Sequence, residues 1–417
     1  MSPKSQRPSP LDALLYHDPS MTIGALLHFH GTRPPLQALT DHVRRRLSSI
    51  PALSSVMQGR GLQARWHQTH PTLEHHIRAH PLAAGDTTDD AVRELARAPF
   101  VPGAPPWDLT LLYGYARYRY AVLYRVNHGL QDGGGFVHAL ETLFTPTAIP
   151  YHRSSAAVRH LAEPPRPTLR ETTAAARLLA RATAKTGLWP HPQHGHSAER
   201  IFQWTAVPTP TLRALAAPFA GTVNDAYMAT LAHAVQGWVT RYHPRPTPRT
   251  PVTVAVNART TTTLALPGNH TAAGRLSLPG PGTPLPRALC DTVRAAAPLK
   301  SPAHREAVRR LTYGPPPWLV QASFKTLLRP ERGSVFCSHL VFRNPLSFRG
   351  DPVDAVQPLT CLPLGSPASA LLFTHRDRSS AVFVTDSALP GMDALHQRWR
   401  DTVSTAATTP TAARPTP

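Results

Sequence analysis

The stretch RVNHGLQDGGG, Arg125 to Gly135, sets a histidine, an aspartate four residues later and three glycines at the end of an apolar run. The run before it, 120–127, is rich in aromatic and β-branched residues, which predicts a strand. The glycines at 133–135 permit a turn before FVHALETLF continues as a helix. We therefore expect His128 at a strand end, facing a cleft, with Asp132 capping the helix or pairing with an arginine.

Two interpretations of His128 follow from this pattern. Histidine has the unperturbed side-chain pKa nearest neutrality, so a positioned imidazole can take a proton from a hydroxyl or amine. Alternatively, His128 is one of 23 histidines and simply ends a strand, with Asp132 and the glycines as ordinary turn residues. Spacing alone favours the second interpretation.

Composition places the chain among globular proteins. Its 417 residues, 41% of them hydrophobic, suffice for two domains or for one large domain built of two halves. The amino terminus lacks the apolar core of a secretory signal, and no window approaches the roughly 18 apolar residues of a membrane span. The three cysteines, Cys290, Cys337 and Cys361, have no CxxC spacing, which fits a reducing cytoplasm. We expect a cytoplasmic protein, with peripheral membrane contact left open.

The formal net charge of +20 raises the question of an anionic partner. Almost all basic residues are arginines in a chain rich in alanine and proline, so the excess either serves phosphates, such as those of a coenzyme, or reflects composition. No basic run is interleaved with aromatics, and no helix-turn-helix or zinc-finger spacing occurs. Nucleic acid is not an expected partner.

Strand and helix patterns alternate along the chain, which predicts a mixed α/β fold. Strands are predicted at 21–31, 62–67, 107–115, 120–127, 201–207, 252–257, 271–279, 334–342, 369–375 and 380–386. Helices are predicted at 35–47, 87–100, 136–144, 169–187, 224–242 and 392–404, with two more between 280 and 333. We predict an N-terminal half over 1–165, a linker over 166–200, a C-terminal half over 201–403 and a disordered tail over 404–417.

Asn127, His128, Asp132 and Gly133 match the HHxxxDG motif of the acyltransferase superfamily that includes chloramphenicol-acetyltransferase-like enzymes and peptide-synthetase condensation domains. More narrowly, the chain resembles the bacterial wax ester synthase/diacylglycerol acyltransferase family. Segments similar to that family occur in the same order along most of the chain: SPLDALLYHDPSMTIGALLHFHG, ARWHQTHPTLEHHIRAHPL, PFVPGAPPWDLTLLYG, TVNDAYMATLAHAV, VAVNART and the pair Gly268-Asn269.

The resemblance implies two chloramphenicol-acetyltransferase-like halves in a V, with a channel between them and His128 near its middle. It also implies acyl transfer from an acyl-CoA or acyl-carrier-protein thioester to a hydroxyl acceptor such as a long-chain alcohol or diacylglycerol. His128 would be the general base, and Asp132 and Gly133 would be structural, with Arg259 pairing with Asp132 across the halves. No bound cofactor or metal is implied.

The resemblance also assigns supporting residues, each with an alternative. Asn224 and Asp225 would lie near the channel, while Asn224 is equally suited to a helix N-cap. Arg259 has the alternative of a surface ion pair. Trp107 would support the strand beside the channel, and we expect it to pack in the core rather than touch substrate.

Three departures from the family pattern limit what the resemblance implies. The first histidine of the motif is Asn127, whose amide offers a donor and an acceptor and is a candidate oxyanion donor beside backbone N–H groups. The family's PLW signature is Pro105-Pro106-Trp107 here, and its NVPGP appears only as RNPLSF, which contains Asn344. The first departure spares the base, whereas the other two concern the acceptor pocket.

Two other functions therefore stay open. One is a stand-alone condensation-type enzyme that forms an ester or amide on a specialised metabolite, and a basic channel mouth would favour it over an apolar one. The other is a degenerate binding protein, favoured by Asn127 but opposed by the retention of His128, Asp132 and Gly133.

Other site motifs receive little support. The histidines of HPQHGH (His191, His194, His196) and EHHIRAH (His75, His76, His80) lack a carboxylate or cysteine in a zinc spacing, so no metal site is expected. Neither GxGxxG, GxxxxGK[ST] nor GxSxG occurs, which argues against nucleotide-phosphate loops and a serine-hydrolase elbow.

Overall fold

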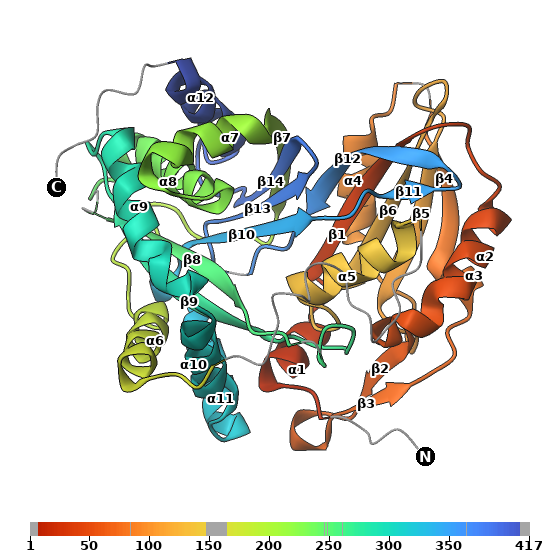
Figure 1. The fold of residues 1–417 in the computed structure, drawn as a ribbon, viewed down its shortest axis with the longest axis horizontal. Helices are drawn as coiled ribbons and strands as arrows, with labels where there is room; N and C mark the ends of the chain where they lie inside the picture. Colours follow the sequence, from red (N-terminus) through yellow and green to blue (C-terminus); the bar gives the residue numbers. More distant parts are fainter. Residues whose placement is uncertain are drawn as a thin grey trace.

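The computed structural model describes residues 7–408 other than 84, 147–164, 246, 248, 261 and 364. Two lobes, each built on one large sheet, lie side by side (Figure 1). Both sheets have six strands, with helices packed on them, so the mixed α/β prediction is confirmed.

The N-terminal lobe has the strand order β11-β12-β1-β6-β5-β4. Strand β6 is central and buried along nearly its whole length, because it pairs antiparallel with β1 on one side and β5 on the other. The strands are β1 (Thr22–His30), β4 (Ile77–Pro81), β5 (Trp107–Tyr113), β6 (Arg119–Asn127), β11 (Ser347–Phe348) and β12 (Asp351–Leu359), beside a small pair, β2 (Ser55–Gln58) and β3 (Arg65–Gln68). The helices are α1 (Pro10–Tyr16), α2 (Leu36–Arg46), α3 (Leu73–His76), α4 (Thr88–Arg97) and α5 (Gly133–Phe144).

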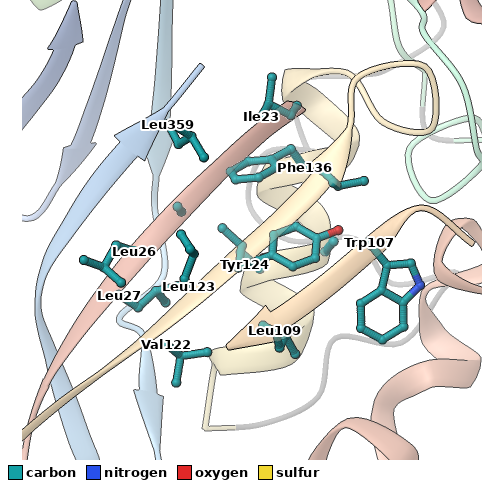
Figure 2. Close-up of a cluster of buried hydrophobic side chains, with 14 of the residues drawn as sticks. Ile23, Leu26, Leu27, Trp107, Leu109, Val122, Leu123, Tyr124, Phe136 and Leu359 are labelled. Atoms are coloured by element: carbon teal, nitrogen blue, oxygen red, sulfur yellow. The ribbon is translucent and has the colours of Figure 1, made fainter. Parts of the chain in front are cut away.

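Apolar side chains on β1, β5 and β6 pack against α5 and form the core of this lobe (Figure 2). Tyr124 and Phe136 lie within this cluster with their ring centroids 5.4 Å apart. The Tyr124 hydroxyl is satisfied because it donates to Gln131 Oε1 at 2.7 Å. Packing on this central strand fixes the position at which β6 ends, immediately before His128.

The C-terminal lobe has the strand order β7-β14-β13-β10-β8-β9. Its longest helix, α8, begins with a capping box between Thr222 and Asp225 and is buried along most of its length. The strands are β7 (Arg200–Pro208), β8 (Arg249–Asn257), β9 (Thr271–Pro279), β10 (Val335–Phe342), β13 (Ala368–His375) and β14 (Arg378–Asp386). The helices are α6 (Leu169–Ala182), α7 (Thr209–Ala216), α8 (Val223–Tyr242), α9 (Leu285–Lys300), α10 (Pro302–Tyr313), α11 (Pro317–Leu327) and α12 (Leu395–Thr408).

One segment of the C-terminal half joins the N-terminal sheet, which corrects the predicted domain ranges. Strands β11 and β12 lie inside the range 201–403 but belong to the N-terminal sheet, where β12 pairs antiparallel with β1 (Figure 1). Helix α12 also continues to Thr408, so residues 404–408 are helical rather than disordered. The rest of the predicted tail and most of the connection before α6 lie outside the described residues.

Candidate active site

The backbone of His128 is held by the residues around it. Its N–H donates to Met21 O at 2.7 Å, and its carbonyl accepts from Asn269 Nδ2 at 2.7 Å. The imidazole is half-buried, and its Nδ1 is buried without a hydrogen-bond partner among the described residues. Met21 directly precedes β1 of the N-terminal lobe, and Asn269 lies two residues before β9 of the C-terminal lobe. Both lobes therefore position His128.

The three glycines after Asp132 form the first turn of α5 and not the separate turn that we predicted. Asp132 is the N-cap, and its Oδ1 accepts from the N–H of Gly135 at 2.9 Å. A Cβ on Gly133 would lie 2.7 Å from Leu340 Cδ2, and one on Gly135 would lie 2.8 Å from Arg259 Nη2. The glycines therefore leave room for side chains of the C-terminal lobe at the helix start.

Asp132 and Arg259 form a buried ion pair between the lobes. Arg259 Nε donates to Asp132 Oδ1 at 2.6 Å, and both side chains are 0% exposed. Asp132 Oδ2 also accepts from the N–H of His270 at 2.7 Å. Burial alone would raise the pKa of Asp132, but Arg259, His270 and the backbone N–H donors of Gly135 and His270 outweigh it and lower the pKa to about 2. The carboxylate is ionised and its contacts are structural.

Arg259 also holds the loop between β8 and β9. Its guanidinium donates to the carbonyl oxygens of Leu264 at 3.0 Å, Leu266 at 3.2 Å and Gly268 at 2.6 Å. A guanidinium with this many buried acceptors is well compensated. The alternative of a surface ion pair is therefore wrong for Arg259.

Asp12 makes a second connection between the lobes, one that sequence reasoning missed. Its Oδ1 accepts from Asn269 N at 2.6 Å and from Asn269 Nδ2 at 3.0 Å. A Cβ on Gly268 would lie 2.5 Å from Asp12 Oδ2. Burial raises the pKa of Asp12 to about 6, despite the hydrogen bonds that lower it. The SPLDAL segment and the Gly268-Asn269 pair thus meet next to the backbone of His128. Both segments are similar to the wax ester synthase/diacylglycerol acyltransferase family, and this similarity was the feature of the sequence that could have indicated the contact.

The side chain of Asn127 is occupied by its own turn. Its Nδ2 donates to Asp18 O at 3.2 Å and its Oδ1 accepts from the N–H of Gly129 at 2.7 Å. The residue is 2% exposed and lines neither of the cavities beside His128. This geometry gives no support to Asn127 as an oxyanion donor.

The remaining predicted site residues have different surroundings: Trp107 lies in the core, Asn224 at a cavity and Asp225 at the start of α8. Trp107 donates from Nε1 to Leu53 O at 2.7 Å and stacks on His76 with centroids 4.3 Å apart, as core packing requires. Asn224 lines a cavity next to His128. Asp225 lies outside that lining: it accepts from Lys300 Nζ at 2.7 Å and completes the capping box of α8, whose N-cap is Thr222 and not Asn224.

Two cavities of different chemistry meet at His128. The arginine-lined cavity, about 390 Å³, includes Arg305, Arg343, His339 and Asn224. The apolar cavity, about 170 Å³, is walled largely by hydrophobic side chains of α1, α11 and β10. Seven residues line both cavities: His128, Val254, Ala255, Thr271, Cys337, Ser338 and Thr360.

Two titratable side chains at these cavities are neutral at physiological pH. Burial raises the pKa of Cys337 to about 12, which keeps it a thiol and argues against a nucleophilic role. Burial lowers the pKa of His339 to about 4, and its Nε2 lies 2.9 Å from Thr374 Oγ1. Of the two described histidines that line these cavities, His128 lines both and His339 lines only the arginine-lined one.

Other regions offer less. A larger groove of about 700 Å³ lies between α7, α8, α9 and α12, and none of the predicted site residues lines it. Within the described part of the chain, no group of three or more histidine, cysteine, aspartate or glutamate side chains is placed to hold a metal ion. Among the helices of that part, none is long and apolar enough to cross a membrane.

The two lobes have the chloramphenicol-acetyltransferase-like fold, as expected. The model of the wax ester synthase/diacylglycerol acyltransferase catalytic domain matches residues 10–267, more than half of the chain. The protein belongs to this family and is an acyltransferase. Among curated proteins, no sequence gives a significant match.

Solved structures share the fold at low sequence identity. The wax ester synthase/diacylglycerol acyltransferase from Marinobacter aquaeolei VT8 is 17% identical, with 96% of this chain and 98% of that chain covered and a TM-score of 0.60. The first condensation domain of the CDA synthetase is 16% identical, with 99% and 98% covered and a TM-score of 0.65. A mutant starter condensation domain of rhizomide synthetase RzmA, in complex with C8-CoA, is 15% identical, with 97% and 94% covered and a TM-score of 0.64.

Proposed function

We propose that this acyltransferase moves an acyl group from acyl-CoA to the hydroxyl of an apolar alcohol, with His128 as the general base. The observation that carries the proposal is the position of His128 at the junction of two chemically different cavities. A bisubstrate reaction needs both reactants at one base, and this junction brings them to the same imidazole.

The arginine-lined cavity suits the donor. Arg305 and Arg343 supply positive charge for the phosphates of CoA, which guanidinium groups recognise through paired hydrogen bonds. A neighbour of the same fold, the RzmA starter condensation domain, is solved in complex with C8-CoA. We place the thioester at the inner end of this cavity, beside His128.

The apolar cavity suits the acceptor. Leu11, Leu15, Met21 and Phe336 line it, and His128 is the one histidine among its described lining residues. A long-chain alcohol has one polar group, and burying its methylene chain stabilises the complex by about 0.8 kcal/mol per CH₂. This cavity orients such an alcohol with its hydroxyl toward the imidazole.

In the proposed mechanism the imidazole of His128 accepts the hydroxyl proton while the oxygen attacks the thioester carbonyl. The tetrahedral intermediate then collapses, the carbon–sulfur bond breaks, and the proton is returned to the leaving thiolate. Asp132 takes no part, because its oxygens contact Arg259, Thr271 and backbone N–H groups. We assign the oxyanion to the hydroxyls of Ser338 and Thr360, which line both cavities.

The proposal is tested by offering the protein acyl-CoAs with alcohol and amine acceptors while free thiol and product mass are followed. Replacing a general base costs about 10²- to 10⁴-fold, so His128→Ala should lose that much activity. His233→Ala is the control, since His233 is also half-buried but lines the groove away from the site. Equal activity of the parent and His128→Ala would refute the catalytic assignment.

Arg305 and Arg343 are also compatible with a second kind of acyl donor. A phosphopantetheine arm on an acidic carrier protein would meet the same positive charge. Acylated carrier protein therefore belongs in the panel, and turnover with it alone would identify a condensation-type enzyme. Absence of turnover with every pair would leave a binding protein as the function.

A further inference from the structure

A third cavity lies beyond the apolar one. This outer cavity, about 290 Å³, is bounded by α6, α10 and α11, with Leu179, Leu311 and Val320 among its lining residues. It reaches the surface at Leu319, which is 42% exposed, next to Trp318, which is 69% exposed. None of its described lining residues is charged.

The apolar and outer cavities touch the same side chains. Ala273, Phe324 and Leu327 line both of them, so a layer of single side chains separates the two spaces. Phe324 and Leu327 lie three residues apart on α11 and therefore share a helix face. Each is 8% exposed, and Ala273 of β9 packs against the same cluster. Removing the phenyl ring of Phe324 would join the two cavities.

We propose that Phe324, with Leu327, sets the longest alcohol chain that the enzyme accepts. This inference rests on the proposed function, because it takes the apolar cavity as the acceptor site. A chain entering from His128 fills the apolar cavity and stops at the Phe324 ring. Past the ring the next space is also apolar, so a chain that crosses the wall would continue to gain from burial.

Four variants test whether the wall, the layer of Ala273, Phe324 and Leu327, limits the alcohol length. Phe324→Ala opens it, and Phe324→Leu opens it partly with less disturbance of packing. Ala273→Leu adds side chain at the shared boundary and should narrow the passage. Phe219→Ala is the control, because Phe219 lines only the distant groove among the cavities described.

The first measurement is kcat/KM for a series of 1-alkanols with one acyl-CoA. Each further methylene that is accommodated should raise kcat/KM about fourfold, which corresponds to about 0.8 kcal/mol. The parent should stop gaining at a certain length, Phe324→Ala at a longer one and Ala273→Leu at a shorter one. Phe219→Ala should keep the parent profile. An unchanged alkanol profile in Phe324→Ala and Phe324→Leu, or a shift seen only when the acyl chain is varied, overturns the proposal.

The second measurement separates this inference from the proposed function. Binding of the same alkanols is followed by calorimetry in a His128→Ala background, which needs no turnover. Absence of turnover together with a Phe324-dependent shift in the bound length would overturn the proposed reaction and support the wall. Turnover in the parent with no shift in either measurement would do the reverse.

Discussion

The arginine-lined cavity and the apolar cavity share the residues around His128 but differ in the side chains that line their other walls. The first takes its charged side chains from α10 and from the segment after β10, whereas the walls that only the second has include side chains of α1 and α11. In the proposed reaction, selectivity for the two substrates therefore depends on different elements. A change on α11 should alter acceptor choice without altering the donor, and a change at Arg305 or Arg343 should do the opposite.

Residues of both lobes line the two cavities, so the lobes must keep one relative position. The buried Asp132–Arg259 pair is one of the contacts that hold them there. Asp132→Ala leaves the Arg259 guanidinium buried without its counter-charge, which costs about 3–5 kcal/mol of folding free energy. Activity toward every substrate pair should fall together. Urea denaturation measures the stability loss, and the exposed Asp41, which pairs with Arg44, serves as the control with an expected change below about 1 kcal/mol. Equal effects at Asp132 and Asp41 would contradict the role of the buried pair.

Local patterns predicted the elements that carry the site. The strand before His128 and the helix after Asp132 were recognised because burial of β6 and α5 leaves a strong apolar signal. The pairing of Arg259 with Asp132 was implied by the family resemblance. In each case the information lies in a short stretch or in a shared motif.

Other contacts between distant segments were not predicted. Strand β12 reads DPVDAVQPL, with two prolines, and its pairing with β1 depends on the assembled sheet. Asp12 meets Asn269 across 257 positions, which no local periodicity encodes. The glycines at 133–135 looked like turn residues because their crowding by Leu340 and Arg259 exists only in the folded lobes.

The second prediction concerns Asp12, which accepts hydrogen bonds from Asn269, a residue that lines the apolar cavity. Burial raises its pKa from 3.8 to about 6, so the folded protein binds more protons than the unfolded chain between these values. Asp12 should therefore make stability fall as the pH rises through that window, by roughly 3 kcal/mol in total. The difference in unfolding free energy between the parent and Asp12→Asn, measured from pH 4 to pH 7, should change by most of this amount. A constant difference would show that Asp12 does not titrate in this window.

The third prediction addresses the donor side. Replacing both Arg305 and Arg343 by alanine should raise KM for acyl-CoA by about 10- to 100-fold, because a charge-assisted contact to phosphate contributes roughly 1.5–3 kcal/mol and about 1.4 kcal/mol corresponds to a tenfold change. KM for the alcohol should stay the same. Higher salt should weaken acyl-CoA binding to the parent more than to the double variant. Arg117→Ala, at an exposed position outside both cavities, is the control; a rise in the alcohol KM would remove the distinction between the two cavities.

The smallest effect is expected at Asn127, where the family motif has its first histidine. The amide holds the turn through Asp18 and Gly129, so its replacement acts on the His128 backbone and not on the substrates. Asn127→His should lose about 1–2 kcal/mol of stability, as expected for buried hydrogen bonds, while kcat/KM changes less than about threefold. Thermal denaturation and the alkanol assay measure the two quantities. If wax ester synthesis appeared only in Asn127→His, long-chain alcohol would not be the acceptor of the natural protein. The apolar cavity would then have to serve another acceptor that still delivers a nucleophile to His128.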